Sequence, residues 1–317
     1  NSTVQWCLAA QALRDTPSKD KPHGFGGNWG GHYASYHHNM IAHCESRVPR
    51  LGPRPTTLAL TECVDIRNNV FYNWAGEGCY GGEDQHVNLV NNYYKPGPAT
   101  DKASSKVQYR IAKIGIYTQE YVQKNPSFAP YAQKWGTFYI DGNVMEGNSG
   151  VTVDNGVYAQ QTNDDKVDNM WTRAAQAGLK LSKPLDYGTV TTHTAEVAYN
   201  KVMKYVGCCD YRDKVDNLVI KDVKNRGASY TASGNLDGYI NTPNDIIELG
   251  SNSWPELSLD TKRCVIDSDG DGIPDEWEIE YGLDPNDSSD GNKKMIDVNG
   301  KYTNLEMYMN SLVHGIV

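Results

Sequence analysis

The chain has few of the features that mark basic, membrane-spanning or zinc-binding proteins. Its 39 acidic residues outnumber its 30 lysines and arginines, and the net charge of −9 argues against a nucleic-acid partner. No apolar run approaches the roughly 20 residues that a membrane-spanning helix needs, and no signal-peptide pattern is present. The seven cysteines show no paired CxxC spacing, which argues against a zinc site. We therefore predict no nucleic-acid, membrane or zinc binding.

The cysteines are scattered, at positions 7, 44, 63, 79, 208, 209 and 264. Their number predicts an exported protein with one or two disulfides and at least one unpaired thiol, and the alternative is a cytosolic chain with free buried cysteines. The chain begins without a methionine, so we expect that an upstream segment has been removed. Asn1-Ser2-Thr3 and Asn286-Asp287-Ser288 match the glycosylation acceptor pattern, which is typical of a secreted glycoprotein.

Phenylalanine is scarce, at 4 residues, whereas there are 21 tyrosines and 30 glycines. A turn-rich composition with polar aromatics favours many short strands and a hydrated, carbohydrate-type surface over a helical bundle. At 317 residues the chain is long enough for one large domain and a small second one. We therefore predict a mainly β protein.

A short pattern recurs along the first half of the chain. Residues 66–71, 89–94 and 140–145 each have an apolar residue, two variable positions, an asparagine and two apolar or aromatic residues. Residues 36–41 fit as well, and residues 4–9 fit with cysteine in the asparagine place, so the markers fall at 7, 39, 69, 92 and 143. Such a period is typical of a coiled parallel sheet, in which each polar side chain meets its counterpart in the next turn of the coil. We predict a ladder of stacked asparagines.

Other segments break this pattern. We interpret residues from about 100 to 135, which are rich in lysine, serine and tyrosine, as a loop excursion from the coil. Residues 194–206 have the apolar spacing of a helix. Residues 217–220, Asn-Leu-Val-Ile, look like a further strand.

The last fifty residues contain a twelve-residue loop, 267–278, that matches the calcium-loop template. Acids stand at loop positions 1, 3, 5 and 9, glycine at 6 and glutamate at 12. The predicted metal ligands are Asp267, Asp269, Asp271, Ile273, Asp275 and Glu278. We expect a structural Ca²⁺ site in a small helical module, residues 263–317, with a helix that Gly282 ends.

A basic segment follows one copy of the repeat. His37-His38-Asn39 is followed by Ser46-Arg47-Val48-Pro49-Arg50. Two arginines so close to a strand end suit an acidic partner, because guanidinium groups form rigid, permanently charged forks for carboxylates. The alternative is a set of ordinary surface ion pairs.

This segment resembles the HHN…R-x-P-R motif of the pectate lyases in polysaccharide lyase family 1. Residues 21–27, Lys-Pro-His-Gly-Phe-Gly-Gly, are similar to the lysine-containing turn that precedes the motif there. Residues 65–69, 90–98 and 212–216 resemble later segments of bacterial members that carry a calcium-loop tail. The resemblance covers nearly the whole chain. It implies an all-β, right-handed parallel β-helix over residues 1–262, and cleavage of pectate by β-elimination with calcium.

The resemblance also assigns roles to single residues. Arg47 stands at the place of the catalytic base that removes the C5 proton of galacturonate, and Lys21 at the place of the lysine that binds the substrate carboxylate. Arg50 would be a further substrate-side arginine. Many family members have another arginine two residues later, where this chain has Gly52. Because arginine is almost always protonated, an arginine base implies an alkaline optimum.

The family's catalytic calcium is held by acids that precede the lysine turn. Here only Asp15 and Asp20 precede Lys21, and neither lies in a matching motif. We therefore expect those ligands upstream of Asn1, so that the chain corresponds to the C-terminal two-thirds of a secreted, monomeric enzyme acting on polygalacturonate or pectin.

Two alternatives stay open. One is a pectin lyase that acts on methyl-esterified chains with an aromatic-lined cleft, for which Trp29, Tyr33 and Trp74 are the candidates, although Lys21 argues against it. The other is a non-catalytic β-helical carbohydrate-binding protein, against which the combination of Lys21 and Arg47 argues.

Overall fold

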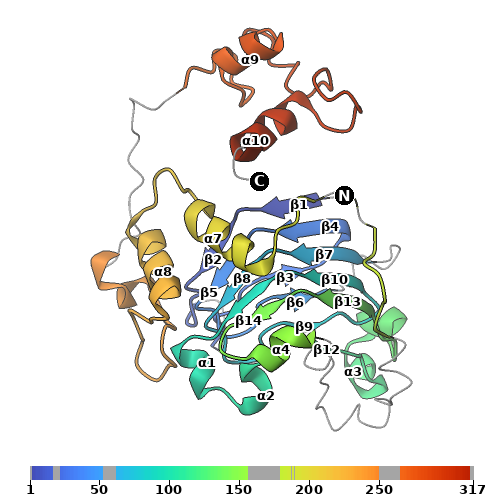
Figure 1. Ribbon diagram of the computed structural model, residues 1–317, viewed down its shortest axis with the longest axis vertical. Helices are drawn as coiled ribbons and strands as arrows, with labels where there is room; N and C mark the ends of the chain where they lie inside the picture. Colours follow the sequence, from blue (N-terminus) through green and yellow to red (C-terminus); the bar gives the residue numbers. More distant parts are fainter. Residues whose placement is uncertain are drawn as a thin grey trace. The chain divides into compact units, whose positions relative to one another are not determined.

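The computed structural model describes residues 2–16, 22–52, 62–155, 179–186, 188, 190–249 and 265–314. The chain divides into two compact units, Asn1–Pro255 and Glu256–Val317, and each is described by itself (Figure 1). Lys21 and Cys264 lie outside the described residues.

The first unit is built on three parallel sheets. The first sheet contains β1 (Ser2–Gln5), β4 (His32–His37), β7 (Cys63–Arg67), β10 (His86–Val90) and β13 (Thr137–Asp141). The second contains β2 (Leu8–Ala10), β5 (Met40–Ala42), β8 (Val70–Tyr72), β11 (Tyr93–Lys95) and β14 (Val144–Met145). The third contains β3 (Asn28–Trp29), β6 (Arg50–Leu51), β9 (Tyr80–Gly81) and β12 (Lys113–Ile114).

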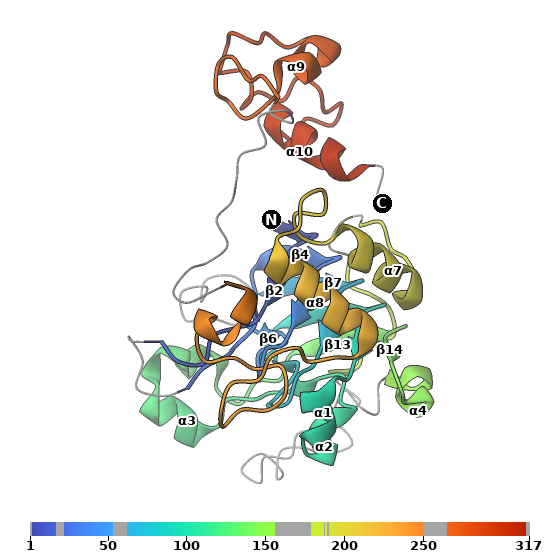
Figure 2. The ribbon, with the colours of Figure 1, turned by 90° about the vertical axis from the view of Figure 1, so that its left-hand side faces the viewer.

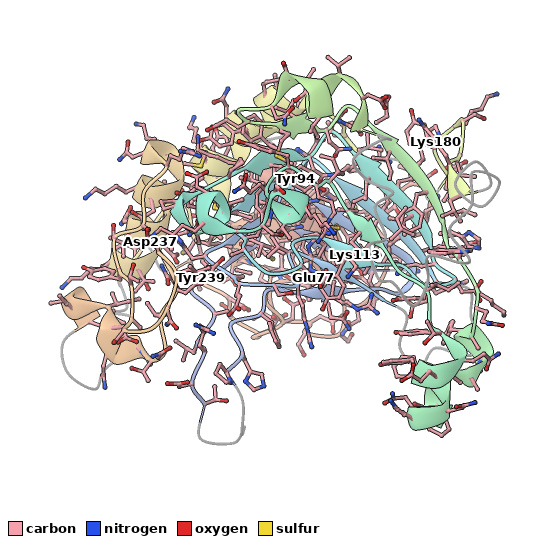
Figure 3. All side chains as sticks on the ribbon, turned by 90° about the horizontal axis from the view of Figure 1, so that it is seen from below. Glu77, Tyr94, Lys113, Lys180, Asp237 and Tyr239 are labelled. Carbon is pink, nitrogen blue, oxygen red and sulfur yellow. The ribbon has the colours of Figure 1, made fainter. Side chains whose placement is uncertain are left out.

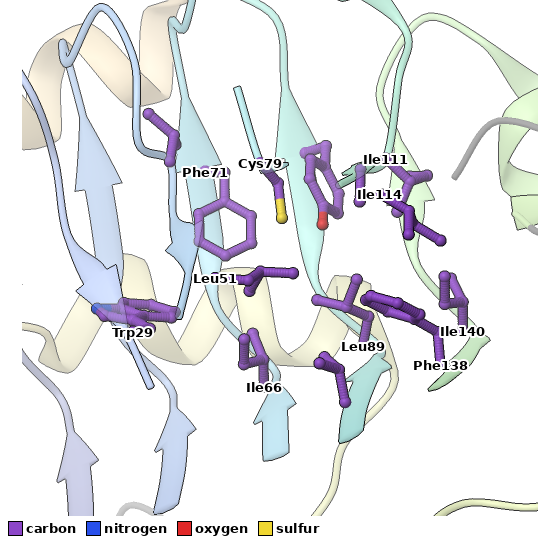
Figure 4. Close-up of a cluster of buried hydrophobic side chains, with 14 of the residues drawn as sticks. Trp29, Leu51, Ile66, Phe71, Cys79, Leu89, Ile111, Ile114, Phe138 and Ile140 are labelled. Atoms are coloured by element: carbon purple, nitrogen blue, oxygen red, sulfur yellow. The ribbon is translucent and has the colours of Figure 1, made fainter. Parts of the chain in front are cut away.

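Successive strands along the chain go to different sheets, and every third strand returns to the same sheet beside its predecessor. Apolar residues therefore align from one strand to the next, as Ile66, Leu89 and Ile140 do in the first sheet. Phe71 of the second sheet and Leu51 of the third belong to the same buried cluster (Figure 4). This arrangement is consistent with a parallel β-helix.

The asparagine ladder is confirmed. Each Nδ2 donates to the Oδ1 of the next asparagine: Asn39 to Asn69 at 3.0 Å, Asn69 to Asn92 at 3.0 Å, and Asn92 to Asn143 at 2.9 Å. Cys7 begins the series, with its backbone N–H donating to Asn39 Oδ1 at 2.9 Å. Asn155 continues the ladder, because Nδ2 of Asn143 donates to its Oδ1 at 3.1 Å. The sequence pattern missed Asn155 because this residue follows the helix α4 (Ser149–Val153) and not a further strand.

Two helices lie beside the second sheet (Figure 2). The predicted helix at 194–206 is confirmed as α7 (Ala195–Tyr205), which Thr194 caps by accepting from the Val197 N–H. The predicted strand at 217–220 is wrong, because these residues belong to α8 (Lys214–Asn225). Asp213 caps α8 by accepting from the Asp216 N–H, and the apolar residues recur at helical spacing. Contact with β8 comes from α7, and Tyr72 of β8 donates to the backbone carbonyl of Gly227, just beyond α8.

Residues from about 98 to 135 combine short helices with one strand. The helices are α1 (Pro98–Lys102), α2 (Ser105–Gln108), α3 (Gln119–Lys124) and the 3-10 helix η2 (Pro126–Tyr131). Between α2 and α3, β12 pairs with β9 and so extends the third sheet. Later in the unit, the segment that contains the 3-10 helices η3 (Pro243–Asp245) and η4 (Ile247–Leu249) is tied back to the strands, because the Tyr239 hydroxyl donates to the Asn73 carbonyl at 2.9 Å (Figure 3).

The second unit contains α9 (Asp275–Tyr281) and α10 (Asn304–His314). The predicted end of the first helix is confirmed, since Gly282 follows α9 with a left-handed φ of 76°. Among the described residues, no helix is long and apolar enough to cross a membrane.

The expected disulfides are wrong for the six described cysteines, none of which forms a disulfide. Cys44, Cys63 and Cys79 are buried in the strand core, where they pack as small apolar side chains.

Candidate functional site

The third sheet presents one row of polar and aromatic residues and one buried row. The register aligns Asn28, Arg50, Tyr80 and Lys113 in the first row, and none of these four is fully buried. The neighbouring row consists of Trp29, Leu51, Gly81 and Ile114, which are buried. Because side chains alternate along a strand, the first row points away from the core.

Arg47 lies in the turn before β6 of this sheet and is held by its backbone. The Gly27 N–H donates to the Arg47 carbonyl at 2.9 Å, and the Val48 N–H donates to the Gly78 carbonyl at 2.9 Å. Arg47 has a left-handed φ of 59°, which is uncommon for a residue with a side chain. A Cβ at Gly26 would lie 2.5 Å from the Arg47 carbonyl oxygen, so this approach requires glycine.

The Arg47 guanidinium lies over the Phe25 ring, 4.4 Å from its centroid. Its Nε is buried and has no hydrogen-bond partner, and within the described part of the chain no carboxylate forms an ion pair with it. The side chain is therefore positioned by a ring and its own backbone, and its charge is not neutralised by a described acid.

Three other described cations of the first unit, Arg14, Arg110 and Lys113, are paired with acids. Arg14 pairs with Glu45 at 3.0 Å. Lys113 pairs with Glu77 at 3.2 Å, and Arg110 donates to the Glu77 carbonyl at 2.7 Å (Figure 3). Arg47 thus differs from these three cations, because no described carboxylate pairs with it.

Arg50 has a different environment from Arg47. Its Nη2 lies 2.8 Å from Glu83 Oε2 and 3.0 Å from the Tyr117 hydroxyl, and its guanidinium lies 5.1 Å from the Tyr80 ring centroid. Burial raises the pKa of Glu83, and the charge of Arg50 opposes that shift. These contacts engage Arg50 with the protein itself and support a structural role for it.

Gly52 departs from the family pattern, and its surroundings explain why. A Cβ at Gly52 would lie 2.3 Å from Glu62 Oε2 and 3.2 Å from Gln85 Nε2. Gln85 donates to the Glu62 carboxylate at 3.1 Å, and the Gly31 N–H donates to it at 3.2 Å. A buried, hydrogen-bonded glutamate therefore fills the space that an arginine side chain at position 52 would enter.

The two histidines of the basic segment are buried in a hydrogen-bonded chain. Nδ1 of His37 lies 2.9 Å from Nδ1 of His38, whose Nε2 lies 3.0 Å from Nδ1 of His193. The His38 ring stacks on Trp6 with centroids 4.6 Å apart. Burial lowers the pKa of His37 to about 4 and that of His38 to about 3, so both are neutral at pH 7. These contacts hold the preceding turn and the segment before α7 together.

Two of the three aromatics considered for a cleft belong to the core. Trp29 is buried and stacks on Tyr36 with ring centroids 4.7 Å apart. Trp74 is buried and donates from Nε1 to the Val107 carbonyl at 3.1 Å. Tyr33 is exposed. The support that Trp29 and Trp74 gave to an aromatic-lined cleft is therefore lost.

Acidic residues converge in the second unit. Carboxylate oxygens of Asp267, Asp269 and Asp271 lie within 4.8 Å of one another, and so do those of Asp271, Glu278 and Asp290. Ile273, predicted as a backbone ligand, is buried in the same loop. Asp275 instead accepts from Ser268, from its N–H at 2.7 Å and its hydroxyl at 2.6 Å.

Sequence reasoning missed Asp290 and Glu83. Asp290 lies outside the twelve-residue loop, so the loop template does not include it. Glu83 lies 33 residues from Arg50 and meets it only because β9 pairs with β6. A signal for Asp290 did exist, since acids recur every third residue at 284, 287 and 290, but that spacing has no single structural meaning.

Comparison with known proteins gives the chain its relatives. No protein-family model matches it. It is similar to a curated protein named probable pectate lyase C from Aspergillus terreus, with 30% identity over 255 residues, which are 78% of this chain and 48% of that protein. Proteins of the same name from Aspergillus flavus and Aspergillus oryzae are 30% and 29% identical over 256 residues, with the same coverage.

The names of these relatives place them among the polysaccharide lyases. The chain is homologous to these proteins named pectate lyase over 78% of its length. It spans about half the length of the curated relatives it matches.

Proposed function

We propose that the protein is a secreted pectate lyase that cleaves polygalacturonate by β-elimination, with Arg47 as the base. The observation that carries this proposal is the environment of Arg47. This arginine is fixed by its backbone and by Phe25, and no described carboxylate neutralises its charge, whereas Arg14 and Lys113 are paired with acids. Similarity to proteins named pectate lyase supports the same interpretation.

The proposed step is an elimination across C4 and C5 of a galacturonate unit. Arg47, in its neutral form, takes the C5 proton, and the electron pair of that C–H bond forms a C4–C5 double bond. The C4–O bond to the leaving chain breaks, and the leaving oxygen takes a proton from water. Because the guanidine must be neutral to accept the proton, the rate should rise towards alkaline pH.

The substrate carboxylate gains negative charge in this step and needs nearby positive charge. In the proposal this comes from Lys21, which lies outside the described residues, and from calcium, which when bound supplies Lewis-acid neutralisation. Within the described residues, the acidic groups that could hold a metal ion all belong to the second unit.

The finer features of the fold and the cofactor are also proposed. The three sheets would form a right-handed parallel β-helix over residues 1–262, and residues 263–317 would form a calcium-binding tail on the loop 267–278. The protein would be a secreted, monomeric glycoprotein whose partner is an acidic polysaccharide. Convergent carboxylates in the loop support its role as a calcium site.

An assay of the unsaturated product tests the function. The protein and its Arg47→Ala variant are incubated with polygalacturonate, with calcium or with a chelator, and the ultraviolet absorbance of the product is followed. We expect calcium-dependent product that rises with pH, and a loss of at least about 10²-fold in Arg47→Ala. Arg226→Ala is the matched control and should keep the activity, because Arg226, at the end of α8, is paired with Asp101 of α1.

Three outcomes would contradict parts of the proposal. Retained activity in a folded Arg47→Ala variant, checked by circular dichroism, would remove Arg47 as the base. Product from methyl-esterified pectin alone would favour a pectin lyase. Absence of product from either substrate would favour a non-catalytic carbohydrate-binding protein.

A further inference from the structure

The two carboxylate clusters of the second unit share Asp271. One cluster comes from the first turn of the loop 267–278, and the other adds Glu278 at the start of α9 and Asp290 from a later turn. Because both contain Asp271 and each is within 4.8 Å across, all five carboxylates gather around one region. The loop template accounts for four of them but not for Asp290.

The buried members of this group lack the partners that buried carboxylates need. Glu278 is 0% exposed and neither of its oxygens has a hydrogen-bond partner. Asp290 is 3% exposed, and its Oδ1 also has none. The Oδ2 atoms of Asp269 and Asp271 are also buried and have no hydrogen-bond partner. An unpaired buried charge costs several kcal/mol, so an arrangement of this kind needs a cation.

No described basic side chain supplies that charge. Lys293, three residues after Asp290, pairs with Asp287 at 3.1 Å instead.

The remaining atoms of Asp290 fix its position. Its Oδ2 accepts from the Asp284 N–H at 3.0 Å, and its backbone carbonyl accepts from Nδ2 of the buried Asn304 at 2.8 Å. A Cβ at Gly291 would lie 2.2 Å from Asp271 Oδ2, so the chain after Asp290 runs directly against another ligand. Asn304 begins α10, and the Leu305 N–H donates to the Gly291 carbonyl at 3.0 Å.

We propose that Asp290 is a metal ligand, which completes the site of the loop 267–278 from outside the loop. The inference rests on the proposed calcium loop and deepens it. One oxygen each from Asp267, Asp269, Asp271, Asp290 and the Ile273 carbonyl, with two from Glu278, gives about seven, within the range that calcium takes and above the six of magnesium. The ion thereby joins the start of α9 to the start of α10, and the fold of the second unit depends on it.

Terbium luminescence on the full chain tests this assignment, because Trp277 lies next to Glu278 and can sensitise a bound Tb³⁺ ion. The variants are Asp290→Asn, Glu278→Gln and the control Glu280→Gln, which removes the same charge from an exposed position of α9. We expect the first two to weaken Tb³⁺ binding, and its displacement by Ca²⁺, by about tenfold or more, since ligand charge sets the affinity of such sites. The control should stay within about twofold of the wild type.

Hydrogen exchange separates a ligand from a merely structural residue. The amide oxygen that Asp290→Asn introduces can still accept from the Asp284 N–H, so this variant keeps the fold contact and loses the charge. We expect calcium to protect α9 and α10 in the wild type far more than in Asp290→Asn. With a chelator present, Asp290→Asn should be protected at least as well as the wild type, because one repelling charge is gone.

The outcomes separate the role of Asp290 from the proposed calcium loop and from the proposed lyase activity. Weakened binding in Glu278→Gln with unchanged binding in Asp290→Asn would overturn the role of Asp290 and keep the loop. Equal loss of protection by Asp290→Asn with calcium and with chelator would assign Asp290 a structural role only. Identical binding in wild type and Glu278→Gln would overturn both the loop and Asp290, and would leave the lyase assay untouched.

Discussion

At the scale of single residues, Arg47 and Arg50 show how differently two arginines three positions apart can be used. Arg50 belongs to β6 and meets Glu83, Tyr117 and Tyr80. Arg47 lies in the turn before β6 and meets the Phe25 ring. The sequence presents the two as equivalent members of one motif, but their surroundings assign one to the scaffold and leave the other available.

The ion pair of Arg50 should contribute strongly to stability. The side chains of Arg50 and Glu83 are only 15% and 8% exposed, at an N–O distance of 2.8 Å. We expect Glu83→Gln to lower the free energy of unfolding by about 3 kcal/mol, because it leaves a buried guanidinium without its counter-charge. Urea unfolding of the first unit measures this loss.

The exposed pair of Lys124 and Glu120 is the matched control. Its N–O distance is 2.9 Å, but its side chains are 71% and 51% exposed, so Glu120→Gln should change stability by less than about 1 kcal/mol. A similar small effect for both variants would show that Arg50 is not held by Glu83 in solution.

At the scale of elements, the turn between the first and second sheets explains why the repeat is legible. In this turn each asparagine uses both ends of its amide, as Asn69 does by donating to Asn92 and accepting from Asn39. The preceding residues, such as His38 and Asn68, have left-handed φ values of 55° and 58°. A side chain with a donor and an acceptor is required at every repeat after the first, where Cys7 takes part only through its backbone N–H, so the pattern survives in the sequence.

An interior member of this ladder should be costly to remove. We expect Asn69→Ala to lower the free energy of unfolding by about 2–4 kcal/mol, since it leaves the buried backbone N–H of Asn39 without its acceptor and removes one hydrogen bond each from the Asn39 side-chain amide and the Asn92 oxygen. Chemical unfolding checks this, with the exposed Asn217→Ala in α8 as a control expected within about 0.5 kcal/mol of the wild type. Equal effects of the two substitutions would contradict a stabilising ladder.

The incorrect strand at 217–220 has an instructive cause. Leu218, Val219 and Ile220 are consecutive apolar residues, which a strand and a buried helix share. The helix is decided over a longer window, by Val215, Leu218, Val219 and Val223 on one face and by the Asp213 cap. A four-residue window is too short to show whether apolar residues recur at the helical period of 3.6 residues.

At the scale of the whole molecule, the chain His37–His38–His193 connects the strands to the segment before α7. The groups around it are Asp65, Arg67 and Lys201, of which the two cations lower the pKa values of the histidines and Asp65 raises that of His37. Burial is the largest cause and lowers both pKa values. The contacts therefore exist in the neutral state.

Acidification should weaken the first unit through these histidines. Their folded pKa values of about 4 and about 3 lie below the unfolded value of 6.5, so the unfolded chain binds more protons in this window. Stability is complete above about pH 6.5 and falls as the pH drops towards 4, by about 2–4 kcal/mol. Urea unfolding at pH 7.5 and 5.0 measures the loss.

The matched variants for this experiment are His38→Gln and His32→Gln. The first removes the central imidazole of the hydrogen-bonded row His37–His38–His193, and we expect its stability to be less sensitive to pH than that of the wild type. The second changes a half-buried histidine of β4 that does not belong to this row of histidines, and it should leave the pH sensitivity of stability unchanged. An equal loss in the wild type and His38→Gln would locate the pH dependence elsewhere.

The sequence by itself determined the repeated strands, the asparagine ladder, the helix at 194–206 and the acidic loop, because each is recorded in a short local pattern, which in the ladder recurs from one repeat to the next. Only the tertiary structure decided which of Arg47 and Arg50 is paired, why Gly52 must lack a side chain, and that Asp290 joins the acids of the loop. These depend on Glu83, Glu62 and a turn beyond α9, which reach their partners through strand pairing and chain reversal. Local patterns record local constraints, whereas a charge is neutralised by whatever group the fold brings beside it.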